Sequence, residues 1–412
     1  MSSFRIAIIL FAAIGSLPAP WVRAGDELFD PDPRHPWNRL HRFLYVRTLG
    51  SGKTLDYDGL DAPVSRLGKF LIVEPSHKQA LILLDDFLKT NADKRIKDPL
   101  KRALMQRDLW YVFDALAQTN KQTIYLELEA EDRQPQRLEV ERRLAQIMKR
   151  LALSEQEIEA LPDNYSAAIR TGTFPGNFDP KNPDRPFLSP DLFSKNSPWI
   201  YVKAWGNDLG ARDHINGTDC RALFTVLFRV PAGRKAAEAY VASLHPGKEA
   251  PRVPEGAMFA LVRQTVLIND RGLPQASGLV EHVQLRTFPT FKEQHFYEWL
   301  LDRKDLLAGK NGGLHARKLD DLEVVTGYLP PLADPFEAAD APLMDKPLRG
   351  CIGCHQPAED ILSVVTFGGR RLEGWQGGDL TDRETQARET RDRKRMSYSW
   401  GLFKGLCEES RP

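Results

Sequence analysis

The sequence predicts an α+β multidomain fold, and three observations support this. Residues 25–170 carry apolar side chains at helical spacing, whereas residues 196–329 contain runs rich in Val, Ile, Phe, Leu and Thr that are typical of strands. A proline-dense stretch, residues 171–195, separates the two. We therefore expect a mostly helical region after a leader (residues 1–24), a mixed α/β middle domain with antiparallel strands, and a small C-terminal segment, residues 330–412.

The composition is that of a globular protein with ample material for a core. The chain has 412 residues, 42% of them hydrophobic, and 57 Lys and Arg balance 56 Asp and Glu. The basic residues are dispersed and form no stripe that would follow a phosphate backbone. We therefore expect no nucleic-acid partner.

In the helical region, apolar stripes and starting signals coincide. Ser76 and the pair Asp98-Pro99 are typical helix starts, and Ser154 with Glu157 forms a capping box for a short further helix. Three stripes each fall on one helix face: Leu81, Leu84 and Leu88; Leu100, Leu104, Val112 and Leu116; and Leu144, Ile147, Met148 and Leu151. We interpret these stripes as core faces.

The middle domain is predicted to contain strands joined by short connections. The strand-like runs are residues 199–205, 221–230, 257–268 and 279–288. The polar segment 269–272 predicts a turn between the last two runs, and hence a hairpin. A short helix is expected over 233–244, and an amphipathic helix over 290–308 that buries Phe296, Trp299 and Leu300. The proline-dense stretch is either a linker or an ordered wrap.

The N-terminus has the organisation of a secretory signal. Arg5 precedes a nine-residue apolar run, 6–14, and small or permissive residues lead to Ala24. The run is shorter than the roughly 20 residues needed to cross a bilayer. We expect cleavage after Ala24, a periplasmic or otherwise exported protein, and no membrane span in the mature chain.

One segment has only a superficial similarity to a nucleotide-binding loop. Residues 47–54 end in Gly-Lys-Thr, but Arg47 occupies the first position, where the phosphate-binding loop requires glycine. No strong strand-then-helix pattern surrounds the segment. We interpret it as a glycine-rich surface loop.

The C-terminal segment contains the motif that carries chemistry, Cys351-Ile352-Gly353-Cys354-His355. Two thiols separated by two residues can each form a thioether to a haem vinyl group, and the adjacent imidazole can bind the iron. A zinc site would need a second closely spaced ligand pair, which the chain lacks. A thioredoxin-like dithiol is expected after a strand, whereas this motif follows a second proline-rich stretch.

These five positions resemble the haem-binding motif of c-type cytochromes, and the resemblance covers about the last 75 residues. The whole chain is similar to large exported bacterial proteins that carry one such motif near the C-terminus. The resemblance implies one covalently attached haem c, held through Cys351 and Cys354 with His355 as proximal iron ligand. It implies no activity for the preceding 300 residues.

The distal iron ligand stays open. The downstream candidate is Met396, which follows a charged stretch and lacks a flanking proline, unlike the distal methionine of small cytochromes. Met344, the loop histidine His214 and a vacant position are the alternatives. A six-coordinate iron favours electron transfer, whereas a vacant position permits binding of a small molecule and chemistry on it.

The leading functional hypothesis is single-electron transfer in the periplasm with a redox partner protein. The first alternative is a haem enzyme with an open distal site, assisted by Asp213 or His214 as an acid/base group. The second is a binding or scaffold protein with a haem sensor tail.

Two cysteines lie outside the motif, Cys220 and Cys407. In an oxidising compartment they either form a disulfide or stay single.

Overall fold

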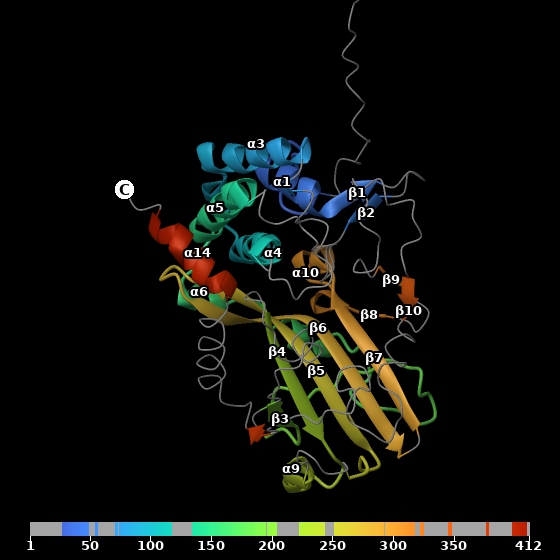
Figure 1. Cartoon of the computed structure of the whole chain (residues 1–412). Helices are drawn as coiled ribbons and strands as arrows, with labels where there is room; N and C mark the ends of the chain where they lie inside the picture. Colours follow the sequence, from blue (N-terminus) through green and yellow to red (C-terminus); the bar gives the residue numbers. More distant parts are fainter. Residues whose placement is uncertain are drawn as a thin grey trace, which may run out of the picture.

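The computed structural model has an α+β fold, which confirms the predicted class: helices pack across one end of an antiparallel sheet (Figure 1). The residues that it describes are 27–48, 54–56, 71–72, 74–117, 134–194, 196–203, 222–243, 251–291, 293–317, 322–324, 345–347, 376–378 and 398–409.

The helical layer is built from both ends of the chain. Its helices are α1 (Pro36–Tyr45), α3 (Ser76–Lys89), α4 (Pro99–Ala117), α5 (Gln134–Arg150) and α14 (Tyr398–Glu409), with the 3-10 turn η1 (Ala92–Lys94) between α3 and α4. The C-terminal helix α14 packs on α4 and α5, and Figure 1 shows it beside α5. Trp400 and Phe403 of α14 lie against Trp110 and Phe113 of α4.

Two of the predicted helix starts are confirmed, whereas α3 begins at Ser76 with Pro75, and not Ser76, at its N-cap. Asp98 accepts a hydrogen bond from the backbone N–H of Lys101 at 2.8 Å, which caps α4. The capping box at α6 (Glu155–Glu159) is complete: Ser154 Oγ accepts from the backbone N–H of Glu157, and the Glu157 carboxylate accepts from the backbone N–H of Ser154. The buried stripe of α3 differs from the prediction, because its fully buried members include Leu83, Leu84 and Phe87, while Leu81 and Leu88 are only partly buried.

The sheet has seven antiparallel strands within the described ranges, in the order β11-β3-β4-β5-β6-β7-β8. The strands are β3 (Ile200–Lys203), β4 (Ala222–Arg229), β5 (Ala257–Ile268), β6 (Pro274–Thr290), β7 (Glu293–Leu301), β8 (Leu314–Ala316) and β11 (Gln376–Gly378). Two small antiparallel pairs accompany it: β1 (Val46–Thr48) with β2 (Thr54–Asp56), and β9 (Leu322–Val324) with β10 (Asp345–Pro347).

The predicted strands and the hairpin between β5 and β6 are confirmed, as is the helix predicted over 233–244, α9 (Arg234–Ser243). The helix predicted over 290–308 is wrong. This segment forms β7, followed by α10 (Arg303–Leu307) and the 3-10 turn η3 (Asn311–Gly313). Alternate residues Tyr297, Trp299 and Leu301 are buried, and the long pairing with β6 outweighs the helical spacing of the same apolar residues.

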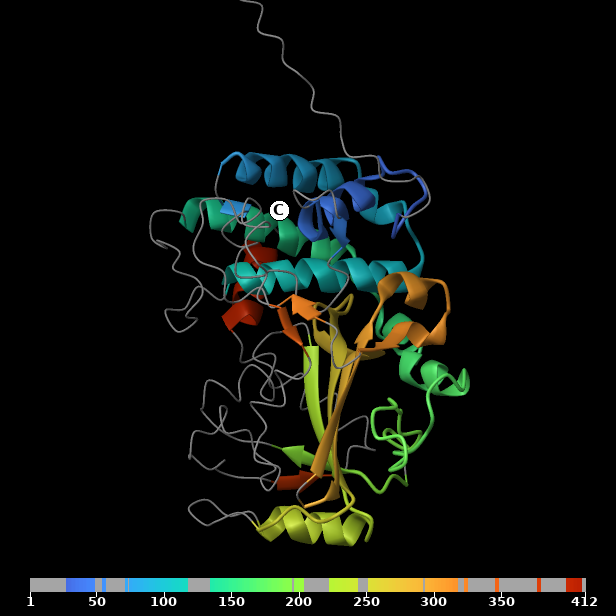
Figure 2. The same ribbon diagram turned by 90° about the vertical axis from the view of Figure 1, so that its right-hand side faces the viewer.

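The proline-dense stretch is an ordered wrap on one face of the sheet. Figure 2 shows it beside the strands, after the short helix α7 (Asn164–Arg170). Phe187 is buried and packs edge-on against Tyr297 of β7, with ring centroids 5.2 Å apart. Tyr165 of α7 donates a hydrogen bond from its hydroxyl to the backbone carbonyl of Ser189. The wrap thus closes the apolar side of the sheet, and the larger hydrophobic cluster joins strands and helices in one core.

None of the helices in the described ranges combines the length and the apolar character that crossing a membrane requires.

Candidate functional site

The haem-attachment residues predicted from the sequence, Cys351, Cys354 and His355, lie outside the described residues, as do the distal candidate Met396 and the cleavage position Ala24. The alternative ligands Met344 and His214, together with Asp213 and Cys220, also fall outside them.

The fourth cysteine, Cys407, is described. It lies on α14, half-buried, with a free thiol whose Sγ is 4.0 Å from the backbone carbonyl oxygen of Ala145. Burial raises the pKa of this thiol. The Cys407 side chain therefore contributes to the packing of α14 on α5.

The described segments on both sides of the attachment motif pair or pack with other segments of the chain. Pro347, the last residue of β10, is four positions before Cys351 and is paired with Leu322 of β9. Downstream, β11 adds to the edge of the sheet through β3, and α14 docks on the helical layer. The three described segments of residues 330–412 thus contact three different parts of the protein.

A buried group of charged side chains, which we call the central charge cluster, joins the helical layer to the sheet. Its members are Arg107 and Asp108 of α4, Arg263 of β5, Glu281 of β6 and Arg303 of α10, all between 1% and 5% exposed. Arg107 donates to both carboxylate oxygens of Glu281, at 2.8 and 3.2 Å, and Arg303 pairs with Asp108. Arg263 Nε lies 3.2 Å from the second oxygen of Glu281.

The carboxylate of Glu281 owes its position to a β-bulge. Arg263 pairs with His282, but the next residue, Gln264, pairs with Val280, so Glu281 is the extra residue of β6. Such a bulge re-aims a side chain and interrupts the ladder locally. Thr265 completes the site by donating its hydroxyl to Glu281 at 2.7 Å. Because its side chains pair with one another, the central charge cluster stabilises the contact between the helical layer and the sheet.

A second polar group lies on the sheet around Glu298 of β7. His282 Nε2 is 2.6 Å from one carboxylate oxygen of Glu298, Gln284 donates to the same oxygen at 2.9 Å, and Arg317 pairs with the other. Burial by itself would raise the pKa of Glu298, but these partners, His282 foremost, lower it to about 2. Glu298 is therefore a permanent carboxylate that fixes the orientation of the His282 ring.

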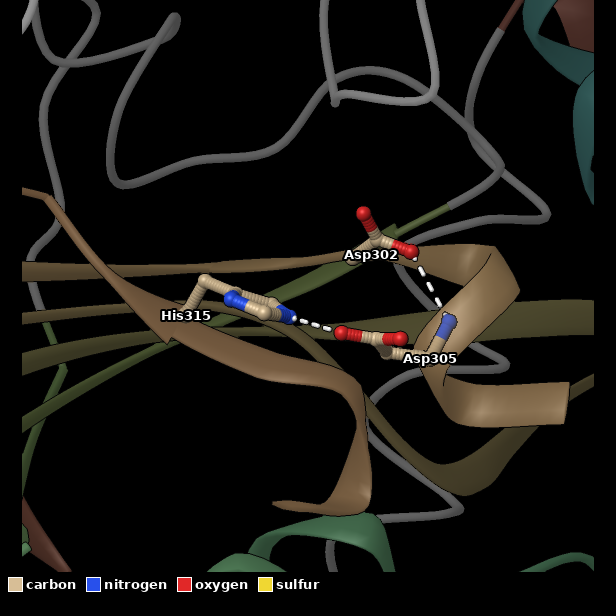
Figure 3. A group of neighbouring side chains, drawn as sticks. All are labelled: Asp302, Asp305 and His315. Atoms are coloured by element: carbon tan, nitrogen blue, oxygen red, sulfur yellow. Dashed lines mark hydrogen bonds and ion pairs between the residues drawn. The ribbon is translucent and has the colours of Figure 1, made fainter. Parts of the chain in front are cut away.

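The third group consists of Asp302, Asp305 and His315 (Figure 3). Among the described residues, it is the group whose side chains could hold a metal ion. Asp302 follows β7 and caps α10, because its Oδ1 accepts from the backbone N–H of Asp305 at 2.9 Å. His315 Nε2 on β8 lies 2.7 Å from Asp305 Oδ2. One ligand atom from each residue lies within 4.8 Å of the others.

Sequence reasoning did not find these three groups. Arg107 and Asp108 are adjacent opposite charges between apolar residues of a predicted core helix, which is a usable signal for a buried ion pair. No comparable signal marks His315, because its partner Asp305 is ten positions away across three glycines.

Comparison with known proteins gives no relative: no family model matches the chain, and neither the curated proteins nor the solved structures contain a match.

Proposed function

We propose that this chain is an exported c-type haem protein that carries one covalent haem and passes single electrons to a redox partner protein in the periplasm. The observation that carries the proposal is the motif Cys351-Ile352-Gly353-Cys354-His355 in a chain whose residues 1–24 have the pattern expected of a secretory signal. The two features are independent, and they agree because haem attachment and export belong to the same compartment.

Each residue of the motif has a defined role in this proposal. The thiols of Cys351 and Cys354 add across the two vinyl groups of the haem, so that each forms a thioether and the haem cannot dissociate. The imidazole of His355 binds the iron on the proximal side. A haem held by these residues would supply a one-electron ferric/ferrous couple for exchange with the partner.

In this proposal residues 330–412 carry the haem, and the large remainder of the chain serves for docking or recognition.

A haem enzyme with an open distal site is the second candidate, and one observation favours it. Met396 follows the charged run of residues 391–395 and has no neighbouring proline, so a distal methionine is poorly marked in the sequence. An open position would bind small ligands such as peroxide.

The first experiment tests covalent attachment. The protein is produced with haem-maturation machinery, and its intact mass and absorption spectrum are compared with those of Cys351→Ala, Cys354→Ala and the control variant Cys407→Ala. We expect the wild type and the control to be coloured and heavier by one haem, with the attachment reduced or lost in the first two variants. Colourless wild-type protein of purely polypeptide mass would end the proposal.

The second experiment separates the two candidate functions. Carbon monoxide is added to the ferrous protein and the absorption spectrum is recorded, with Met396→Ala beside the wild type. An unchanged spectrum with carbon monoxide in the wild type supports a six-coordinate electron carrier. A shift in the wild type indicates an exchangeable or open sixth position and favours the enzyme. An unaltered oxidised spectrum in Met396→Ala would exclude this residue as the ligand.

A further inference from the structure

The group around His315 combines one imidazole nitrogen with two carboxylate oxygens on one short stretch of chain. Asp302 and Asp305 come from the start of α10, and His315 comes from β8, which pairs with β7 so that His315 lies opposite Leu300. Figure 3 shows His315 and Asp305 pointing toward each other, with Asp302 beside them. The imidazole separates this group from the purely acidic clusters that are common on protein surfaces.

The backbone that carries the three side chains is tightly fixed. The backbone N–H of Asp302 donates to the Gly313 carbonyl at 2.7 Å, which closes the loop between β7 and β8. Gly312 and Gly313 have φ values of +59° and +73°, and a Cβ at Gly312 would lie 1.9 Å from the Asn164 carbonyl oxygen. The loop thus fits closely against α7, and only glycine is compatible with this contact.

A buried ion pair also fixes the start of α10. Arg303 immediately follows Asp302, is 1% exposed, and pairs with Asp108 in the central charge cluster. The start of α10 is therefore attached to α4 through a buried ion pair. Asp302 and Asp305 are held on a rigid element, which is the condition for a preorganised ligand site.

In both Asp302 and Asp305, one carboxylate oxygen already contacts a neighbouring group, as is common for side chains that bind metals. One oxygen of Asp302 accepts the backbone N–H of Asp305, and Lys310 Nζ lies 3.5 Å from Asp305 Oδ1. Asp302 therefore has one oxygen fixed by a hydrogen bond, and Asp305 has one oxygen paired with the exposed Lys310 and its other oxygen facing His315.

The distances fit a small divalent ion. Two donors on a tetrahedral zinc with bonds of about 2.0–2.1 Å are separated by roughly 3.4 Å. The distance between His315 Nε2 and Asp305 Oδ2 is 2.7 Å, so these two atoms must move slightly apart to bind zinc. The ligand atoms of the whole group lie within 4.8 Å of one another, so the longest separation must shorten by about 1.5 Å, which side-chain rotation allows. The exposed His315 side chain, at 48%, leaves an entry path.

We propose that Asp302, Asp305 and His315 bind one divalent transition-metal ion, with zinc as the best match to their donor set. Imidazole with carboxylate suits zinc and its neighbours, whereas calcium and magnesium prefer oxygen ligands alone. Three protein ligands leave a fourth position for water. The site is separate from the haem motif, and the proposal does not depend on haem attachment.

The test uses the purified full-length mature protein after treatment with a chelator, which removes labile divalent ions and leaves any covalently held haem in place. Zinc chloride alone is titrated by isothermal calorimetry, and bound zinc is counted by elemental analysis. We expect one zinc per chain, and a loss of affinity of more than about 100-fold in His315→Ala and Asp302→Asn. Asparagine keeps the capping oxygen of residue 302, so α10 remains capped in that variant.

The matched control is His295→Ala. His295 also faces a carboxylate, Glu293 at 2.9 Å, but it does not belong to a group of three metal-binding side chains. Its replacement should leave the zinc affinity unchanged. Zinc should also raise the unfolding temperature of the wild type and of His295→Ala, but not that of His315→Ala. Absence of zinc binding to the wild type, or equal affinity in wild type, His315→Ala and Asp302→Asn, would overturn the proposal.

Discussion

Replacing Glu141 with glutamine should stabilise this protein at alkaline pH and have little effect at acidic pH. Glu141 lies on α5 among buried residues of the helical layer and is itself 0% exposed. Neither carboxylate oxygen accepts a hydrogen bond, and Arg137 Nε lies 3.9 Å from Oε1, beyond hydrogen-bonding distance. A buried carboxyl in this environment is costly to ionise.

The magnitude follows from the pKa. Burial raises the pKa of Glu141 from the ordinary 4.5 to about 7, with Arg137 acting in the opposite direction. A rise of this size corresponds to about 3 kcal/mol of differential stability between the neutral and the ionised side chain. Because the folded-state pKa is raised, the contribution of Glu141 to the free energy of unfolding is most favourable below pH 4.5. This contribution falls as the pH increases toward 7 and stays low above that.

The assay is urea unfolding at pH 5 and pH 8 for the wild type, Glu141→Gln and the control Glu159→Gln, whose side chain is exposed on α6. Glutamine cannot ionise, so the loss of stability between the two pH values should shrink by about 2–3 kcal/mol in Glu141→Gln and stay unchanged in the control. The same pH dependence in all three proteins would refute the reasoning.

Three further substitutions test the packing. Ser154→Ala removes the capping box of α6 and should lower the free energy of urea unfolding by about 1 kcal/mol; no change would show that α6 is held by its packing alone. Glu281→Ala removes the carboxylate that Arg107 and Arg263 share, so that three buried arginines face the single carboxylate of Asp108. The substitution should cost about 3–5 kcal/mol, part of which the double variant with Arg107→Ala should recover. Trp400→Ala should cost about 3–5 kcal/mol and increase hydrogen exchange in α14, whereas unchanged exchange would mean that Trp400 does not hold the helix.

Much of the helical layer could be predicted because its signals are local. The start of α4 at Asp98-Pro99, the stripe on α5 and the capping box at Ser154 each depend on residues within one or two turns of each other. The haem motif is local in the same way, since five consecutive positions carry its chemistry. It remains a prediction that the fold neither strengthens nor weakens.

What the sequence by itself determined is therefore the α+β class, most of the helices and the hairpin at residues 269–272, whereas the haem interpretation of residues 351–355 stays a prediction. Only the tertiary structure decided that residues 293–301 form β7, because pairing with β6 involves residues that a local pattern does not include. It also decided that the bulge at Glu281 aims a carboxylate at Arg107, 174 positions away. The tertiary structure likewise decided that His315 contacts Asp305, because Gly312 and Gly313 adopt positive φ values in the loop between β7 and β8.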